Sequence, residues 1–154
     1  MKALIQRVSC ASVEVDGACV GRIDAGLLVL LGIRREDARA DADRLCRRLP
    51  NLRLFTDADG LMNRSVRDIQ GGILVVSQFT LYADTRKGNR PGFSDAAPPE
   101  IAEPLYRHVL HALRADLGAA RVAAGVFGAH MQVSLCNDGP VTIELVTEGS
   151  VARQ

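Results

Sequence analysis

The sequence predicts a mixed α/β fold in a single domain. Seven or so segments carry the apolar pattern of strands, and two longer segments carry apolar residues at helical spacing. The two helices do not alternate regularly with the strands, which favours a mixed sheet over a βαβ array. The chain of 154 residues has no internal repeat and no linker-like stretch. We therefore expect one domain over residues 1–147 and a mobile tail over 148–154.

The first third of the chain predicts strands followed by a helix. Residues 3–15 alternate apolar and polar side chains as two successive strands, and Asp16-Gly17 is a tight-turn signal. Residues 25–33, AGLLVLLGI, are too apolar for a half-exposed strand, so we expect a central strand that is covered on both faces. From Glu36 to Leu49 the apolar residues recur at helical spacing, and Pro50 should end this helix.

The rest of the chain predicts further strands and a second helix. Residues 51–66 indicate a short strand and a turn, and 71–84 a strand that begins apolar and ends polar. The irregular segment 84–99 is long enough to be functional or mobile. A helix is expected from Pro99 to Leu117, stopped by Gly118. The final stretch, 131–146, predicts a hairpin with its turn at Asn137-Asp138-Gly139. The expected inward residues of the second helix are Ile101, Leu105, Val109, Ala112 and Leu113.

Composition limits the classes of function. Hydrophobic residues make up 47% and aromatic residues 4% without any Trp, so Val, Leu, Ile and Ala must build the core. A net charge of +1 excludes a strongly basic surface for long duplexes, but allows a local contact with an RNA end. Cys10, Cys19, Cys46 and Cys136 have no CxxC spacing, and we expect small buried residues in a reducing compartment. No apolar run approaches about 18 residues, so we expect a soluble cytoplasmic protein without a membrane segment.

Three polar residues crowd the end of an apolar strand, where sheet proteins often carry their sites. They are Ser77, Gln78 and Thr80. Ser77 or Thr80 could act as a nucleophile only beside a base, and no histidine lies in a recognisable nucleophile motif. Hydroxyl groups that are bonded to neighbouring backbone are an equally good interpretation on chemistry alone.

Histidine and basic residues give weaker signals. His108 and His111 have i, i+3 spacing on the second expected helix, but a metal site needs a third ligand on the same face, so we predict no metal. His130 has no carboxylate nearby in sequence to orient it. Gly88–Gly92 lacks the context of a phosphate loop, and the basic residues of segment 84–99 could contact phosphates or be simply solvated.

Two short motifs, in order, make the chain similar to a known family. Ser77-Gln78-Phe79-Thr80-Leu81 and Asn137-Asp138-Gly139-Pro140-Val141-Thr142 match the signature motifs of the D-aminoacyl-tRNA deacylase family. Either motif could arise by chance, whereas both occur here within a chain that resembles the family over essentially its whole length. The resemblance implies largely antiparallel sheets that form a barrel-like core with two main helices, and an enzyme without cofactor or metal.

The resemblance further implies a homodimeric editing hydrolase that cleaves the ester between a D-amino acid and the 3′ end of tRNA. In the family the bond before Pro140 is cis, and Gly139-Pro140 of one subunit reaches into the partner's site to receive the substrate's α-ammonium on two carbonyls. Arg7 matches the arginine that holds these carbonyls, and Asn137 belongs to the same substrate-binding motif. An L side chain would collide with rigid backbone, whereas glycyl-tRNA has no side chain to reject and should be an additional substrate.

For catalysis the resemblance favours a route without a protein nucleophile. The 2′-hydroxyl of the tRNA helps to activate water, and the backbone N–H groups of Phe79 and Thr80 stabilise the oxyanion. Ser77 and Gln78 position the terminal ribose and adenine. Thr80 as a covalent nucleophile is the less favoured route.

Two further residues have two interpretations each. By family analogy Phe127 and Met131 line the adenine pocket, and on chemistry alone they are equally good core residues. Val126 stands where relatives commonly carry Lys or Arg, which weakens the case for a phosphate contact there. Two other functions stay open, namely a tRNA-end binding module without activity and a Ser/Thr esterase that acts on small esters.

Overall fold

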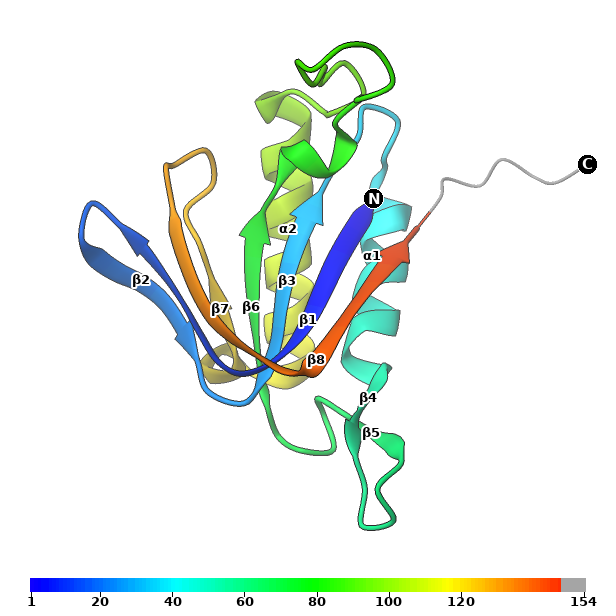
Figure 1. Cartoon of the computed structure of the whole chain (residues 1–154), viewed down its shortest axis with the longest axis vertical. Coiled ribbons are helices and arrows are strands. Elements are labelled where there is room, and N and C mark those ends of the chain that lie inside the picture. The colour runs from blue at the N-terminus through cyan, green and yellow to red at the C-terminus, as the bar shows by residue number, and fades with distance from the viewer. Residues whose placement is uncertain (148–154) are drawn as a thin grey trace, which may run out of the picture.

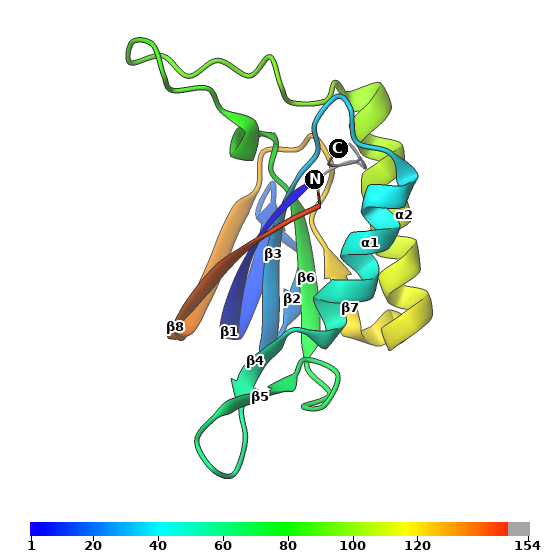
Figure 2. The same ribbon diagram turned by 90° about the vertical axis from the view of Figure 1, so that its right-hand side faces the viewer.

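A strongly curved sheet with two α-helices on one face forms the body of the molecule (Figures 1 and 2). This computed structural model describes residues 1–147, so the tail expected over 148–154 lies outside the described residues. The strands are β1 (Lys2–Val15), β2 (Ala18–Ile23), β3 (Gly26–Gly32), β4 (Arg53–Thr56), β5 (Met62–Ser65), β6 (Gly72–Ser77), β7 (Val122–Ala124) and β8 (Gln132–Val146). The helices are α1 (Arg39–Arg48), α2 (Pro99–Leu117) and the 3₁₀ turns η1 (Leu49–Asn51), η2 (Phe79–Tyr82) and η3 (Ala119–Arg121).

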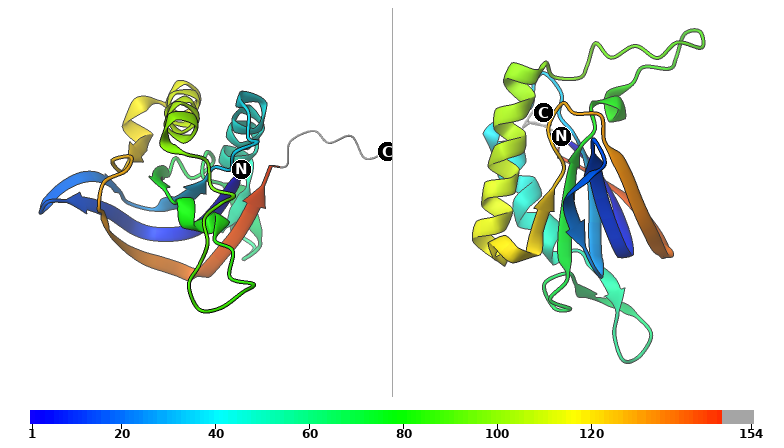
Figure 3. Two further views of the ribbon diagram at one scale, coloured as in Figure 1. Left: turned by 90° about the horizontal axis from the view of Figure 1, so that it is seen from above. Right: turned by 90° about the vertical axis from the view of Figure 1, so that its left-hand side faces the viewer.

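The sheet is mixed and nearly closes on itself. Its strand order is β2-β1-β3-β6-β7, with β8 paired to β1, while β4 and β5 form a separate hairpin. The pairs β3–β6 and β6–β7 are parallel, and all pairs of β1 are antiparallel. Gly21 of β2 lies so close to β7 that an added Cβ would be 2.5 Å from the carbonyl oxygen of Ala124. The view from above shows this curvature (Figure 3). The mixed α/β fold with a barrel-like core is thus confirmed.

Two apolar clusters lie on opposite faces of the central strand β3. Leu27, Val29 and Leu31 point toward the helices and join the larger cluster. Leu28 points the other way, into a smaller cluster within the curve of the sheet. Both sets are almost fully buried, which confirms the prediction of a central strand that is covered on both faces.

The second helix has the predicted bounds, whereas its buried face is shifted. Val109 and Leu113 are buried as expected, but Ile101 is 38% exposed. Ala102 and Tyr106, one position further along each turn, face the core instead. The apolar stripe of this helix is wide, so the sequence does not determine which of two adjacent sets of residues faces the core.

The first helix begins later than predicted, at Arg39 instead of Glu36. Two carboxylates build a turn before it: Asp37 accepts the N–H of Arg34 at 2.8 Å, and Asp41 accepts the N–H of Ala38 at 3.0 Å. The chain then continues through Pro50 as the short η1 turn.

The predicted final hairpin is wrong, because β8 is one strand. Residues on both sides of the Asn-Asp-Gly sequence pair with β1, from Glu14↔Gln132 to Lys2↔Val146. Between the pairs Gln6↔Thr142 and Val8↔Asn137, β8 has four residues where β1 has one. These four, Asp138–Val141, form what we call the β8 bulge. Likewise, residues 3–15 form a single strand, β1, and not two.

Two further expectations need correction. The strand expected over 71–84 ends at Ser77, because the next residues coil into η2. The cysteines are not buried: Cys10, Cys19 and Cys136 are exposed and Cys46 is half-buried. Composition cannot place a residue on the inner or outer face of its strand, and the three exposed cysteines lie on outer faces. Within residues 1–147, neither helix is long and apolar enough to cross a bilayer.

Candidate active site

A cavity of about 620 Å³ opens where β3 and β6 end and α2 begins. Parallel strands bring their carboxyl ends to the same edge of a sheet, which is where open α/β sheets commonly bind ligands. Five of the predicted catalytic and substrate-binding residues line it: Ser77, Gln78, Phe79, Phe127 and Met131. The cavity therefore unites the first motif with two residues about fifty positions downstream.

The turn after β6 shapes one wall of this cavity. The backbone N–H of Gln78 donates to the carbonyl oxygen of Leu31 at 2.8 Å, a hydrogen bond that follows the last β3–β6 pair. Its side-chain amide donates to the hydroxyl of Thr80, which is solvent-exposed. Phe79 and Thr80 begin η2, and the first N–H groups of a helical turn have no acceptor within it. Phe79 lines the cavity, whereas Thr80, the next residue of η2, is outside the lining.

Phe127, which lines the cavity, packs on a buried tyrosine. The Tyr106 hydroxyl donates to the carbonyl oxygen of Val75 at 2.9 Å, and the ring packs against Phe127 with centroids 5.7 Å apart. Burial raises the pKa of Tyr106 to about 12, so this hydroxyl stays protonated at neutral pH. Phe127 packs on the larger cluster and Met131 on the smaller one, while both also line the cavity. Core packing and pocket lining, alternatives in the sequence, therefore coexist.

Several lining residues had no signal in the sequence. Phe93 packs edge-on against Phe79 with ring centroids 5.0 Å apart. Arg35 and Ala97 also line the cavity. His130, which was named from the sequence without a role, lines it too. These residues lie in irregular connections without a repeating pattern, so only the fold brings them together. The one available hint was the length of segment 84–99. Val126, next to Phe127, is 43% exposed and carries no charge.

The segment that follows η2 carries an ion pair. Arg86 donates to both carboxylate oxygens of Asp84 at 2.8 Å. These side-chain hydrogen bonds, together with the Arg86 backbone N–H, hold the pKa of the Asp84 carboxyl well below its usual range. Among residues 1–147 no three His, Cys, Asp or Glu side chains gather closely enough to bind a metal ion.

The second motif lies away from the cavity, on the β8 bulge. Register shows this: Asn137 pairs with Val8, Val8 with Gly26, and Gly26 with Gly72, the first residue of β6. Ser77 is the last residue of β6, so the bulge and the cavity are about 17 Å apart along the strands. Figure 1 shows the bend of β8 at the end of the sheet opposite η2. One chain does not bring the two motifs together.

The bulge itself is held by short contacts. The bond between Gly139 and Pro140 is cis, and both residues are exposed. Arg7 donates to the carbonyl oxygen of Asp138 at 3.0 Å and to that of Leu54 at 2.6 Å. The carbonyl that Arg7 holds within the motif is therefore that of Asp138.

The Asn137 side chain forms hydrogen bonds with the residues at the other end of the bulge. Its side-chain oxygen accepts the N–H of Val141 at 3.1 Å, and its amide donates to the hydroxyl of Thr142 at 3.1 Å. This explains physically why the motif contains an asparagine and a threonine at this spacing.

Comparison with known proteins agrees with this arrangement. A solved structure described as the c-Myc DNA unwinding element binding protein superimposes with a TM-score of 0.91 at 46% identity, covering 97% of this chain and 100% of that one. A D-aminoacyl-tRNA deacylase of Roseiflexus castenholzii is 60% identical over 94% of this chain and 91% of its own length. One of Chlorobaculum parvum is 57% identical over 94% of this chain and 97% of its own. The family model described as D-Tyr-tRNA(Tyr) deacylase matches residues 4–146. The chain therefore belongs to the D-Tyr-tRNA(Tyr) deacylase family.

Proposed function

We propose that the protein is a chiral editing enzyme that hydrolyses D-aminoacyl-tRNA, leaves L-aminoacyl-tRNA intact, and also accepts glycyl-tRNA. Its relatives of 54–60% identity are named D-aminoacyl-tRNA deacylases, and membership of this family makes it a hydrolase of the aminoacyl-tRNA ester. We expect it to act in the cytoplasm, on the acceptor end of tRNA, without a metal or other cofactor.

The observation that carries the proposal is the separation of the two motifs within one chain. The cavity has Ser77 and Gln78 but lacks Gly139-Pro140, which stands exposed at the opposite end of the sheet. A second copy of the chain, related by a two-fold axis, would supply the dipeptide to each cavity in a closed, reciprocal way. The exposed edge of β8 is a surface on which such a copy could pack.

In the complete site each group would have one role. The terminal adenosine would enter between Phe127 and Met131, with its ribose held by Ser77 and Gln78. The N–H groups of Phe79 and Thr80 would bind the developing oxyanion, and the tRNA 2′-hydroxyl would help to activate water. No covalent intermediate is then required.

Chirality would be read at the dipeptide from the partner. Its carbonyls would bind the α-ammonium, while the ester carbonyl lies at the oxyanion donors. With two substituents of the α-carbon fixed, only hydrogen and the side chain exchange places between D and L. The L side chain would be driven into backbone, which cannot give way, and glycine would escape this exclusion.

The first test is paired deacylation of D-tyrosyl-, L-tyrosyl- and glycyl-tRNA with EDTA present. Rapid loss of the D and glycyl esters, with the L ester stable, is the expected result. Equal loss of D and L esters would refute chiral editing, and loss of neither would favour a tRNA-end binding module. A Thr80→Ala variant should stay active, because only the exposed hydroxyl is removed and the backbone N–H remains. Complete inactivity of that variant would instead favour a Ser/Thr esterase.

Mixing two inactive variants tests the shared site. One variant carries Ser77→Ala and Gln78→Ala in the cavity, and the other carries Gly139→Lys, which places a cation where the substrate ammonium would bind. A mixed dimer has one intact site, so random mixing should restore about a quarter of the wild-type rate. A mixture as inactive as its parts, with exchange of subunits verified by mass, would show that each chain uses its own dipeptide.

A further inference from the structure

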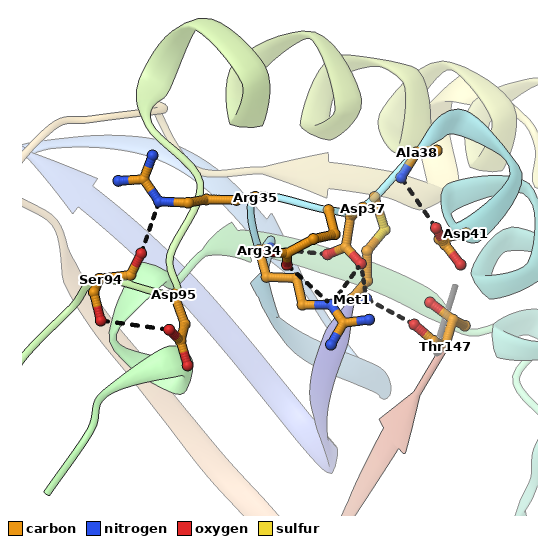
Figure 4. A network of polar contacts seen from close by, with 10 residues as sticks. Met1, Arg34, Arg35, Asp37, Ala38, Asp41, Ser94, Asp95 and Thr147 are labelled. Atoms are coloured by element: carbon orange, nitrogen blue, oxygen red, sulfur yellow. Dashed lines mark hydrogen bonds and ion pairs between the residues drawn. The ribbon is translucent and has the colours of Figure 1, made fainter. Parts of the chain in front are cut away.

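The α-amino group of Met1 is buried and forms an ion pair inside the protein (Figure 4). Its nitrogen donates to Oδ1 of Asp37 at 2.6 Å and to the carbonyl oxygen of Thr147 at 2.8 Å. Both partners of the ion pair have fully buried side chains, and the Met1 side chain joins the larger apolar cluster. The α-ammonium therefore serves as the buried positive partner of the Asp37 carboxylate.

Asp37 depends on this ammonium. Its Oδ2 accepts the N–H of Arg34 at 2.8 Å. The Arg34 side chain is 34% exposed and approaches Oδ1 only to 3.5 Å. The ammonium is therefore the nearer of the two cations and the one shielded from water. Without it, a buried carboxylate would keep only a backbone donor and a distant, solvated guanidinium.

The turn that Asp37 holds also carries one wall of the cavity. The carbonyl oxygen of Ile33 accepts the N–H of Ala97 at 2.9 Å. The backbone N–H of Arg35 donates to the carbonyl oxygen of Asp95 at 3.2 Å, and its Nε–H donates to the carbonyl oxygen of Ser94 at 2.7 Å. Ile33, Arg35 and Ala97 line the cavity. Figure 4 shows the contact of Arg35 with Ser94 beside the contacts of Met1 and Arg34 with Asp37.

We propose that the free α-ammonium of Met1 is a positioning group of the active site, and that this nitrogen is a modification site at which acylation switches the enzyme off. A formyl or acetyl group would convert a cation with three donors into a neutral amide with one N–H. It would also add a carbonyl group beside Asp37 and the carbonyl of Thr147, where only donors fit.

Hydrolysis of a formyl amide breaks its C–N bond, with water supplying the hydroxyl to formate and the hydrogen to nitrogen. Such a deacylation would restore the α-ammonium that pairs with Asp37. The effect on activity rests on the function proposed above, whereas the effects on stability and local order do not.

The test compares four forms of the full chain with a matched control. Protein with a free Met1 amine is compared with Nα-formyl protein, each as wild type and as Asp37→Asn. Glu36→Gln is the control, because it removes an exposed carboxylate that also contacts Arg34, at 3.7 Å. Melting temperature, amide hydrogen exchange at Arg35 and Ala97, and the kcat and KM for D-tyrosyl-tRNA are measured.

Formylation of the wild type should lower the melting temperature by roughly 10 °C. It should also speed exchange at both amides and raise KM more than it lowers kcat. In Asp37→Asn it should add little, because the carboxylate on which it acts is gone. The control should match the wild type.

Equal losses on formylation with and without Asp37 would overturn the ion pair as the cause. Unchanged exchange at Arg35 and Ala97 below the melting transition would overturn the positioning role. If no form cleaves the ester, the proposed function fails, but melting and exchange still decide the role of Met1.

Discussion

Replacing Arg7 with Ala should loosen the β8 bulge and damage editing more than its effect on folding alone would explain. Arg7 lies on β1 and ties two other elements to it, through the carbonyl of Leu54 at 2.6 Å and that of Asp138 at 3.0 Å. Its guanidinium also packs under Gly139, where an added Cβ would lie 2.9 Å from Nη2. The substitution therefore removes the support of the bulge from below.

The two hydrogen bonds differ in what they contribute to stability. Leu54 is 9% exposed, so its carbonyl would lose a charged donor with little access to water. Asp138 is on the surface, with 57% of its side chain exposed, so its carbonyl can turn to solvent and its ion pair contributes little. A charged hydrogen bond is worth about 1.5–3 kcal/mol, so we expect a total loss of about 2–4 kcal/mol once the packing of the side-chain stem is included. This corresponds to a fall in melting temperature of roughly 5–15 °C.

Urea unfolding and deacylation of D- and L-tyrosyl-tRNA at 25 °C measure both consequences. We expect kcat/KM for the D ester to fall at least tenfold, which is about 1.4 kcal/mol of lost transition-state stabilisation, with reduced discrimination against L. Arg7→Lys should be intermediate, because a single ammonium keeps the charge but cannot bridge carbonyls on two elements. Wild-type stability together with wild-type selectivity in Arg7→Ala would refute the reasoning.

Three other substitutions test the fold and the ion pair between Asp84 and Arg86. Gly26→Ala should abolish soluble expression, because its Cβ would lie 2.0 Å from the carbonyl oxygen of Gly72 in the paired strand. Tyr106→Phe should cost about 1 kcal/mol in urea unfolding, since its β6 acceptor also receives a backbone N–H and is not orphaned. Arg86→Ala should raise the pKa of Asp84 toward its ordinary value, as followed by NMR titration of the carboxyl carbon. The depressed pKa stabilises the fold above the unfolded pKa, and this stabilisation is lost as pH falls, so the variant should lose less stability in acid.

Controls and contrary results for these three are simple. Gly60→Ala meets nothing within 4 Å and has only its φ of +80° to strain, so it should fold with a cost of about 1–2 kcal/mol. Folded, stable Gly26→Ala protein would contradict the close approach of β3 and β6. A fall of more than about 3 kcal/mol in the free energy of unfolding of Tyr106→Phe would contradict the view that the hydroxyl contributes one hydrogen bond to a shared acceptor. An Asp84 pKa that is unchanged in Arg86→Ala would contradict the ion pair as the cause of its low value.

Local chemistry in the sequence was enough for several elements. The unbroken apolar run of β3 predicts burial on both faces, and Pro99 and Gly118 mark the ends of α2 by their backbone preferences. Both motifs were found as well, because each is a short contiguous segment. The helix phase of α2 and the inward or outward position of the cysteines were wrong, since both depend on which neighbour covers a face.

The β8 bulge shows the limit most clearly. Asn-Asp-Gly is a turn sequence, and a turn was a sound local inference, yet both flanks pair with β1 so that the chain goes on in one direction. Pairing with a long partner strand outweighed the local preference of about three residues. The same holds for Asp37, whose buried partner is 36 residues away.

The amino-acid sequence by itself determined the family, the class of fold, the bounds of α2 and the buried strand β3, because those follow from motifs, apolar periodicity and Gly or Pro at fixed positions. Only the tertiary structure decided where the chemistry lies. It brought Phe93 and Arg35 to the cavity of Ser77 and Gln78, held Met1 against Asp37, and set Gly139-Pro140 at the far end of the sheet. The physical reason is that these positions are contacts between segments distant in the chain, and such contacts leave no periodic trace in the sequence.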